Sequence, residues 1–122
     1  NNFKKAEEIL RKKGFEKAAK KEGRETNQGL IDSYVHQNGK IGAMVELLCE
    51  TDFVARTDEF RHLAHEICMQ VAAMDPKDNK VLLAQEYIRD PSRKISDLVS
   101  ETIAKLGENI TIGRISRFEL GK

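Results

Sequence analysis

The chain has 122 residues, of which 34% are charged and 39% hydrophobic, and its formal net charge is +1. This length suits one compact domain, and no apolar run approaches the roughly 20 residues that a membrane-spanning helix requires. Two cysteines give no disulfide framework and the first residues lack the pattern of a secretory signal, so a reducing, cytoplasmic setting is favoured.

The first 28 residues are predicted to form a short helix and a linker. Apolar residues recur three and four positions apart from Phe3 to Leu10, which predicts a helix over residues 2–13. Gly14 follows as the residue expected to end that helix. Residues 15–28 continue with weak helical character and become polar, so we interpret them as a linker.

A β-hairpin is predicted over residues 30–49. Apolar and polar residues alternate up to the dipeptide Asn38-Gly39, which is typical of a type I′ turn with two positive φ angles. The return strand, residues 41–49, is apolar at nearly every position except Glu46. This pattern predicts a strand that is covered on both faces over part of its length.

Two longer amphipathic helices are predicted in the second half of the chain. Thr57 is a suitable N-cap for a helix of about five turns that ends at Asp75-Pro76. A second helix follows Pro91, and Gly107 is expected to close it in a left-handed conformation.

Two further segments are predicted to be strands. Residues 81–88, VLLAQEYI, are compatible with a strand or a helical turn, and we favour a strand. Residues 109–120 form a β-prone run in which Gly113 interrupts the alternation and indicates a bulge. Together these elements predict an α+β fold: a three- to four-stranded antiparallel sheet with helices packed on one face, preceded by a short N-terminal helix and linker.

The sequence offers little to suggest catalysis or metal binding. His62, His65 and Cys68 are spaced to share one side of a helix, but Cys68 belongs to the apolar stripe and no second Cys/His pair has finger-like spacing. Cys49 also lies in an apolar pattern, where thiols are usually inert. We therefore predict a protein that is not an enzyme and holds no metal and no cofactor.

Phe53 stands out because it lies in a short polar connection, ETDFVAR. In one interpretation its ring plugs the end of the sheet. In the other, Asp52 and Phe53 form a projecting tip, since an exposed aromatic is a common anchor at protein interfaces. Periodicity alone favours the plug interpretation, and composition does not choose between the two.

The run ELLCETDFVAR, residues 46–56, closely resembles the signature of the elongation factor Ts family, the nucleotide exchange factors of bacterial and organellar translation. Leu48 stands where the family usually has Asn, and the other positions fit. Residues 10–29, LRKKGFEKAAKKEGRETNQG, are similar to the family's link from its N-terminal module into the core. Residues 103–121, IAKLGENITIGRISRFELG, are similar to its C-terminal segment.

The resemblance implies binding to the GDP form and the nucleotide-free form of elongation factor Tu, and faster release of GDP. It assigns to Thr51, Asp52, Phe53 and Val54 the role of dislodging the bound Mg²⁺, with the Phe53 ring as a wedge between helices of the partner's G domain. By linkage, a factor that prefers the nucleotide-free state weakens GDP binding by the same factor. The expected compartment is the cytoplasm, or an organellar matrix in a eukaryote.

The resemblance also divides the chain. Residues 1–14 correspond to the last helix of a truncated N-terminal module resembling ubiquitin-associated domains, residues 15–28 to the linker, and residues 29–122 to the core domain. Between the long helix and the PSRKISDL run, residues 91–98, the family normally carries a longer segment. Because this segment bears on dimerisation, the shortened middle does not decide between a monomer and a homodimer.

A small RNA- or ribosome-binding module is the alternative function. Residues 1–24 carry a net charge of +5 and the rest of the chain −4, and a basic arm can serve nucleic acid or an acidic partner. The lysines of this arm alternate with glutamates, however, and aromatic residues are not regularly interleaved with them for base stacking. A solvated helix face is therefore the favoured interpretation of the arm.

Overall fold

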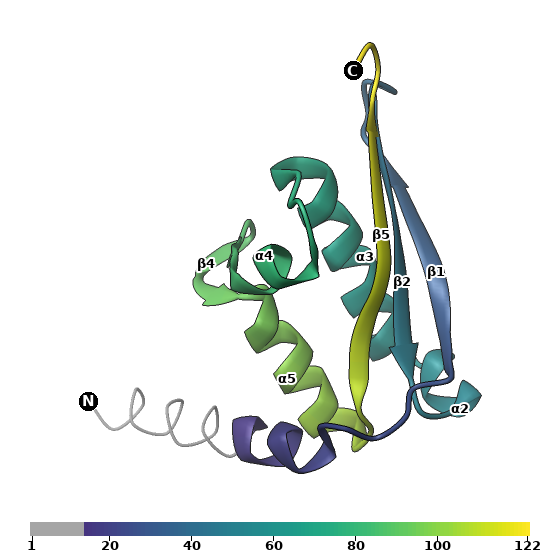
Figure 1. Ribbon diagram of the computed structural model, residues 1–122, viewed down its shortest axis with the longest axis vertical. Helices are drawn as coiled ribbons and strands as arrows, with labels where there is room; N and C mark the ends of the chain where they lie inside the picture. Colours follow the sequence, from purple (N-terminus) through teal and green to yellow (C-terminus); the bar gives the residue numbers. More distant parts are fainter. Residues whose placement is uncertain (1–13) are drawn as a thin grey trace.

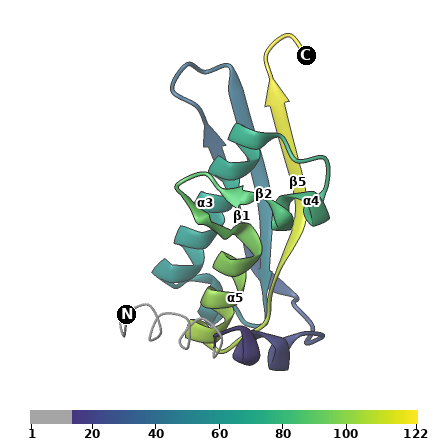
Figure 2. The same ribbon diagram turned by 90° about the vertical axis from the view of Figure 1, so that its left-hand side faces the viewer.

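The computed structural model describes residues 14–122 and has an α+β fold. A three-stranded antiparallel sheet has the order β1-β2-β5, with β1 at Gln28–Val35, β2 at Ile41–Cys49 and β5 at Ile110–Glu119. The helices cover one face of this sheet, as the two views in Figures 1 and 2 show. The predicted fold class is confirmed.

The central strand β2 is covered on one face only. Ala43, Val45, Leu47 and Cys49 are buried against the helices, whereas Met44, on the opposite face, is half exposed. The expectation that β2 would be covered on both faces is therefore wrong. Its largely apolar sequence arises because the outer face also carries apolar side chains, such as Met44, that contact solvent.

The β1–β2 hairpin is confirmed, but its turn differs from the predicted type. β1 ends at Val35 and β2 begins at Ile41, so five residues connect the strands, and Gly39 N–H donates to the His36 carbonyl at 2.8 Å. Gly39 has a φ of +69°, whereas Asn38 does not adopt a positive φ. A loop of this length needs only one left-handed residue, so the type I′ geometry is not required.

The two long helices form as their sequences predict. α3 spans Asp58–Met74 with Thr57 as N-cap, and it ends at Asp75, whose φ is +48°. α5 spans Ile95–Leu106 and ends at Gly107 with a φ of +77°.

The segment between these helices differs from the prediction. Residues 81–84 are helical, within α4 at Asn79–Ala84, because the Asp78 carboxylate caps the helix by accepting from Val81 N–H at 2.8 Å. Only Glu86–Tyr87 (β3) forms a strand in this run, paired with β4 at Asp90–Lys94. The strand prediction for 81–88 is thus wrong over its first half.

The predicted irregularity at Gly113 is confirmed. Val45 pairs with Ile115 and Leu47 with Ile112, so β5 has one extra residue opposite Glu46. The Glu46 carboxylate occupies this position and accepts from Arg114 N–H at 3.1 Å. A Cβ on Gly113 would lie 2.4 Å from a Glu46 oxygen, which explains the glycine.

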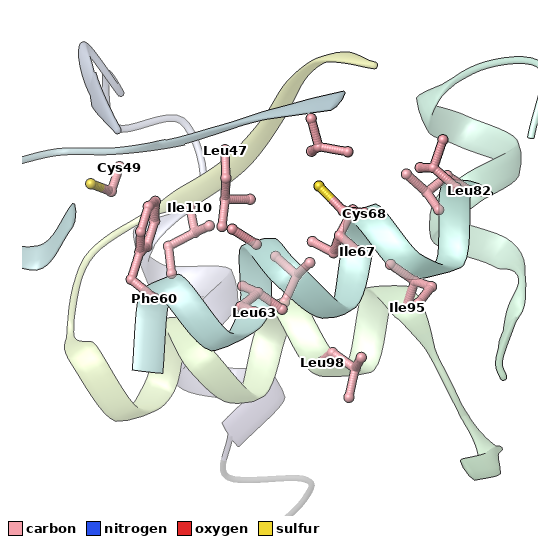
Figure 3. Close-up of a cluster of buried hydrophobic side chains, with 14 of the residues drawn as sticks. Leu47, Cys49, Phe60, Leu63, Ile67, Cys68, Leu82, Ile95, Leu98 and Ile110 are labelled. Atoms are coloured by element: carbon pink, nitrogen blue, oxygen red, sulfur yellow. The ribbon is translucent and has the colours of Figure 1, made fainter. Parts of the chain in front are cut away.

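The core lies between the sheet and helices α3 and α5 (Figure 3). Phe60, Leu47, Ile67, Leu82 and Ile95 are its largest fully buried apolar side chains. Cys49 and Cys68 are also buried and are not joined in a disulfide, so both pack as small apolar groups, as predicted.

The described part of the chain begins with a helical stretch. Residues 14–21 are helical, Gly14 lies within that helical stretch rather than ending a helix, and Gly23 adopts the positive φ of +89°. Ala18 is buried and belongs to the core. The predicted helix over residues 2–13 lies outside the described residues.

Candidate functional site

The residues singled out by the sequence form a one-turn helix at one end of the sheet. α2 spans Asp52–Ala55 and lies at the opposite end of the molecule from the C-terminus (Figure 1). Thr51 is its N-cap, and the Thr51 hydroxyl accepts from Val54 N–H at 3.3 Å. Thr57 closes the other end, because its hydroxyl donates to the Val54 carbonyl at 2.8 Å. We call residues 51–56 the tip.

The tip has one buried side and one exposed side. Val54 and Ala55 are each 5% exposed and belong to the core, whereas the Phe53 side chain is 82% exposed. The plug interpretation of Phe53 is therefore wrong, and the projecting interpretation describes its geometry. A ring in this position contributes almost no burial to the folded state.

The tip also carries an exposed ion pair. Asp52 and Arg56 form an ion pair at 2.7 Å across one helical turn, and both side chains are largely exposed. Exposed pairs of this kind add little to stability. Aromatic residues and arginine are enriched at protein interfaces, and both are exposed on this helical turn.

A contact from a distant part of the chain fixes the base of the tip. The Glu108 carboxylate, just after α5, accepts from Thr51 N–H at 3.0 Å and from the Thr51 hydroxyl at 2.7 Å. Sequence reasoning assigned Gly107 to a helix end and gave Glu108 no role of its own. No local signal could have revealed this contact, because the two residues are 57 positions apart.

The three residues considered for a metal site do not converge. Cys68 is fully buried, while His62 and His65 are at least half exposed. The His62 ring lies 3.6 Å from Glu66, and the His65 ring lies 3.5 Å from Asp32. Within residues 14–122, no group of three His, Cys, Asp or Glu side chains is placed to hold a metal ion.

The two thiols have the properties of unreactive groups. Burial raises the pKa of the Cys68 thiol to about 12. Burial, followed by the nearby Glu108 carboxylate, also raises the pKa of Cys49. Because the thiolate is the nucleophilic form, neither cysteine is prepared for attack at neutral pH.

None of the helices in residues 14–122 is long and apolar enough to cross a membrane.

Comparison with known proteins decides the family. The sequence model of the family described as "Elongation factor TS" matches residues 50–122, a span that includes the whole tip. The chain belongs to the elongation factor Ts family. The predicted resemblance to this family is thereby confirmed, and the chain is placed among the translation elongation factors.

Individual members of the elongation factor Ts family match nearly the whole chain. Elongation factor Ts of Thermoanaerobacter sp. (strain X514) is 43% identical, with 99% of this chain and 81% of the relative covered. Elongation factor Ts of Caldanaerobacter subterraneus subsp. tengcongensis is 42% identical, with 99% and 83% covered. Both alignments span 166 positions, more than the 122 residues of this chain, so both relatives carry residues that it lacks.

Proposed function

We propose that this protein is a guanine-nucleotide exchange factor for elongation factor Tu. It binds the GDP form and the nucleotide-free form, and it speeds GDP release by displacing Mg²⁺. Thr51, Asp52, Phe53 and Val54 form the contact that does so. The observation that carries the proposal is the 82% exposure of Phe53 on a helix whose other side is buried in the core.

Two of the four residues project into solvent, and the other two hold the helix in place. Asp52 and Phe53 face solvent and are available to the partner. Val54 anchors the turn in the core, and Thr51 caps it. This division lets an aromatic side chain enter another protein while its backbone stays fixed to the sheet and to α3.

Exchange by this arrangement needs no catalytic group. Burying a phenylalanine ring contributes about 1.5–3 kcal/mol, which is a factor of roughly ten to a hundred in an equilibrium constant. If the ring is buried only in the nucleotide-free state of the partner, that free energy opposes GDP binding by the same factor. The factor then needs neither a cofactor nor a chemical step.

Stopped-flow release of a fluorescent GDP analogue from elongation factor Tu tests the proposal. We expect the wild-type protein to accelerate release and Phe53→Ala to lose at least tenfold of that acceleration, in line with the burial free energy of the ring. Circular dichroism should show an intact fold for the variant. Phe118, which is 74% exposed on β5 and distant from the tip, provides the matched control, and Phe118→Ala should exchange like wild type.

Two results would contradict the proposal. The first is a wild-type protein that leaves GDP release unchanged at saturating concentration. The second is full activity of a folded Phe53→Ala variant, which would mean that exchange proceeds through another surface. Tight binding to RNA that weakens steeply with added salt would instead favour the alternative RNA-binding module.

A further inference from the structure

Hydrogen bonds to two carboxylates join the base of the tip to the turn after α5, and each segment supplies one of the carboxylates. The Glu108 carboxylate accepts from the backbone N–H and the hydroxyl of Thr51, at 3.0 and 2.7 Å. In return, the Glu50 carboxylate accepts from the backbone N–H of Asn109 at 2.6 Å. Each segment therefore supplies an anion to the backbone of the other, and hydrogen bonds to charged acceptors are the stronger kind.

The same junction holds a third segment. The buried Asn109 side chain donates to the Arg24 carbonyl at 2.9 Å, and the Arg24 guanidinium lies 3.6 Å from the Glu50 carboxylate. Three stretches that are distant in sequence thus meet directly beneath the tip. Arg24 also supplies a positive charge to a junction that otherwise contains two carboxylates.

The Thr51 hydroxyl links this junction to α2. It accepts from Val54 N–H and so caps the helix, and it donates its own proton to Glu108. Because the hydroxyl proton is directed at the carboxylate, the lone pairs of the oxygen can face Val54 N–H. A helix of four residues has little stability of its own, so its geometry depends on such contacts.

We infer that Glu108 is a positioning residue for Phe53. Through its two hydrogen bonds with Thr51, it fixes the direction in which the Phe53 ring projects from the protein surface. This inference rests on the proposed exchange function. An aromatic wedge delivers its binding free energy to a partner only if its base is already ordered, since otherwise part of that energy is consumed in ordering it. Glu108 needs no contact with the partner to have this effect.

The Glu108→Ala and Glu108→Gln variants test the inference in the GDP-release assay. We expect Glu108→Ala to lower the maximal release rate at saturating factor on the order of tenfold, since it removes two bonds to a charged acceptor. The concentration for half-maximal effect should change less, because the contact surface is retained. Glu108→Gln keeps one acceptor oxygen for Thr51 N–H and should recover part of the rate.

The double variant separates positioning from a general loss of structure. In a Phe53→Ala background, Glu108→Ala should have no further effect on the release rate, because Glu108 acts through the ring. Asp97→Ala is the matched control: the Asp97 carboxylate accepts from Lys94 N–H at 2.8 Å at the opposite end of α5. Its loss should lower thermal stability and leave the maximal release rate unchanged.

Amide hydrogen exchange gives a readout that is independent of the partner. The Thr51 and Val54 amides should exchange faster in Glu108→Ala than in wild type or Asp97→Ala. Unchanged exchange at these amides overturns the inference, and so does a Glu108→Ala variant with a wild-type release rate. A full Glu108→Ala effect that persists in the Phe53→Ala background also overturns it. A wild-type protein that does not accelerate GDP release would sink the exchange function itself, and the amide measurement would still decide whether Glu108 orders the tip.

Discussion

Phe53 and Phe60 lie seven positions apart on consecutive helices, yet their side chains are 82% and 0% exposed. Phe60 is in the first turn of α3, beneath the end of the sheet and close to Cys49 (Figure 3). Phe53 is on the side of α2 that faces away from the core. Burial of a phenylalanine is worth about 1.5–3 kcal/mol, so the fold gains this free energy at one position and forgoes it at the other.

The difference separates stability from recognition at the level of single residues. The same side chain holds α3 against the sheet in one place and is left available in the other. Thr57 lies between them, capping α3 through Phe60 N–H and holding α2 through the Val54 carbonyl. Three substitutions, taken in order of decreasing effect on stability, test whether this separation is real.

Phe60→Ala should have the largest effect. Removing a fully buried phenylalanine leaves a cavity and typically costs about 3–5 kcal/mol in the free energy of unfolding. Urea denaturation followed by circular dichroism measures the change, and Phe60→Leu should recover much of the loss. A cost of less than about 1 kcal/mol would mean that the core at this end collapses around the gap.

Thr57→Ala should have an intermediate effect. Loss of an N-cap costs roughly 0.5–2 kcal/mol, and here the same hydroxyl also holds the end of α2. The comparison variant is Thr57→Ser, which keeps the hydroxyl and should unfold close to wild type in the same urea titration. Equal destabilisation by Ala and Ser would assign the effect to the lost methyl group instead.

Phe53→Ala should have the smallest effect on stability, within about 0.5 kcal/mol of wild type, as for most exposed positions. Thermal unfolding of the purified variant gives the value directly. A loss as large as that of Phe60→Ala would mean that the ring packs against the protein in solution, and the contrast between the two phenylalanines would disappear.

Sequence patterns predicted the elements that repeat over several turns or strand positions. The apolar stripe of α3, its Thr57 cap, the closing Gly107 and the Gly113 bulge were all read correctly, because each leaves a local pattern in residue type. The run 81–88 was misread, since its Val and Leu residues favour a strand while the cap from Asp78 selects a helix. The turn at Gly39 was misjudged because loop length depends on strand register.

The residues of the proposed site could be named from the sequence, but their geometry could not. The family resemblance names residues 51–54 and favours a projecting Phe53. Periodicity alone favours a ring that plugs the end of the sheet, because a four-residue helix is too short to show which side faces the core. The two hydrogen bonds between Glu108 and Thr51 are tertiary contacts that no local sequence pattern encodes.

The two buried thiols allow local and global unfolding to be measured by alkylation of the natural sequence, without any substitution. Cys49 lies at the base of the tip, where its thiol donates to the Thr51 carbonyl at 3.1 Å, and Cys68 is packed in the core on α3. Cys68 is fully buried, and burial raises the pKa of its thiol to about 12, so its alkylation must await an opening event. Faster alkylation of Cys49 than of Cys68 would show that the tip end opens by itself, and equal rates would show that tip and core unfold as one unit.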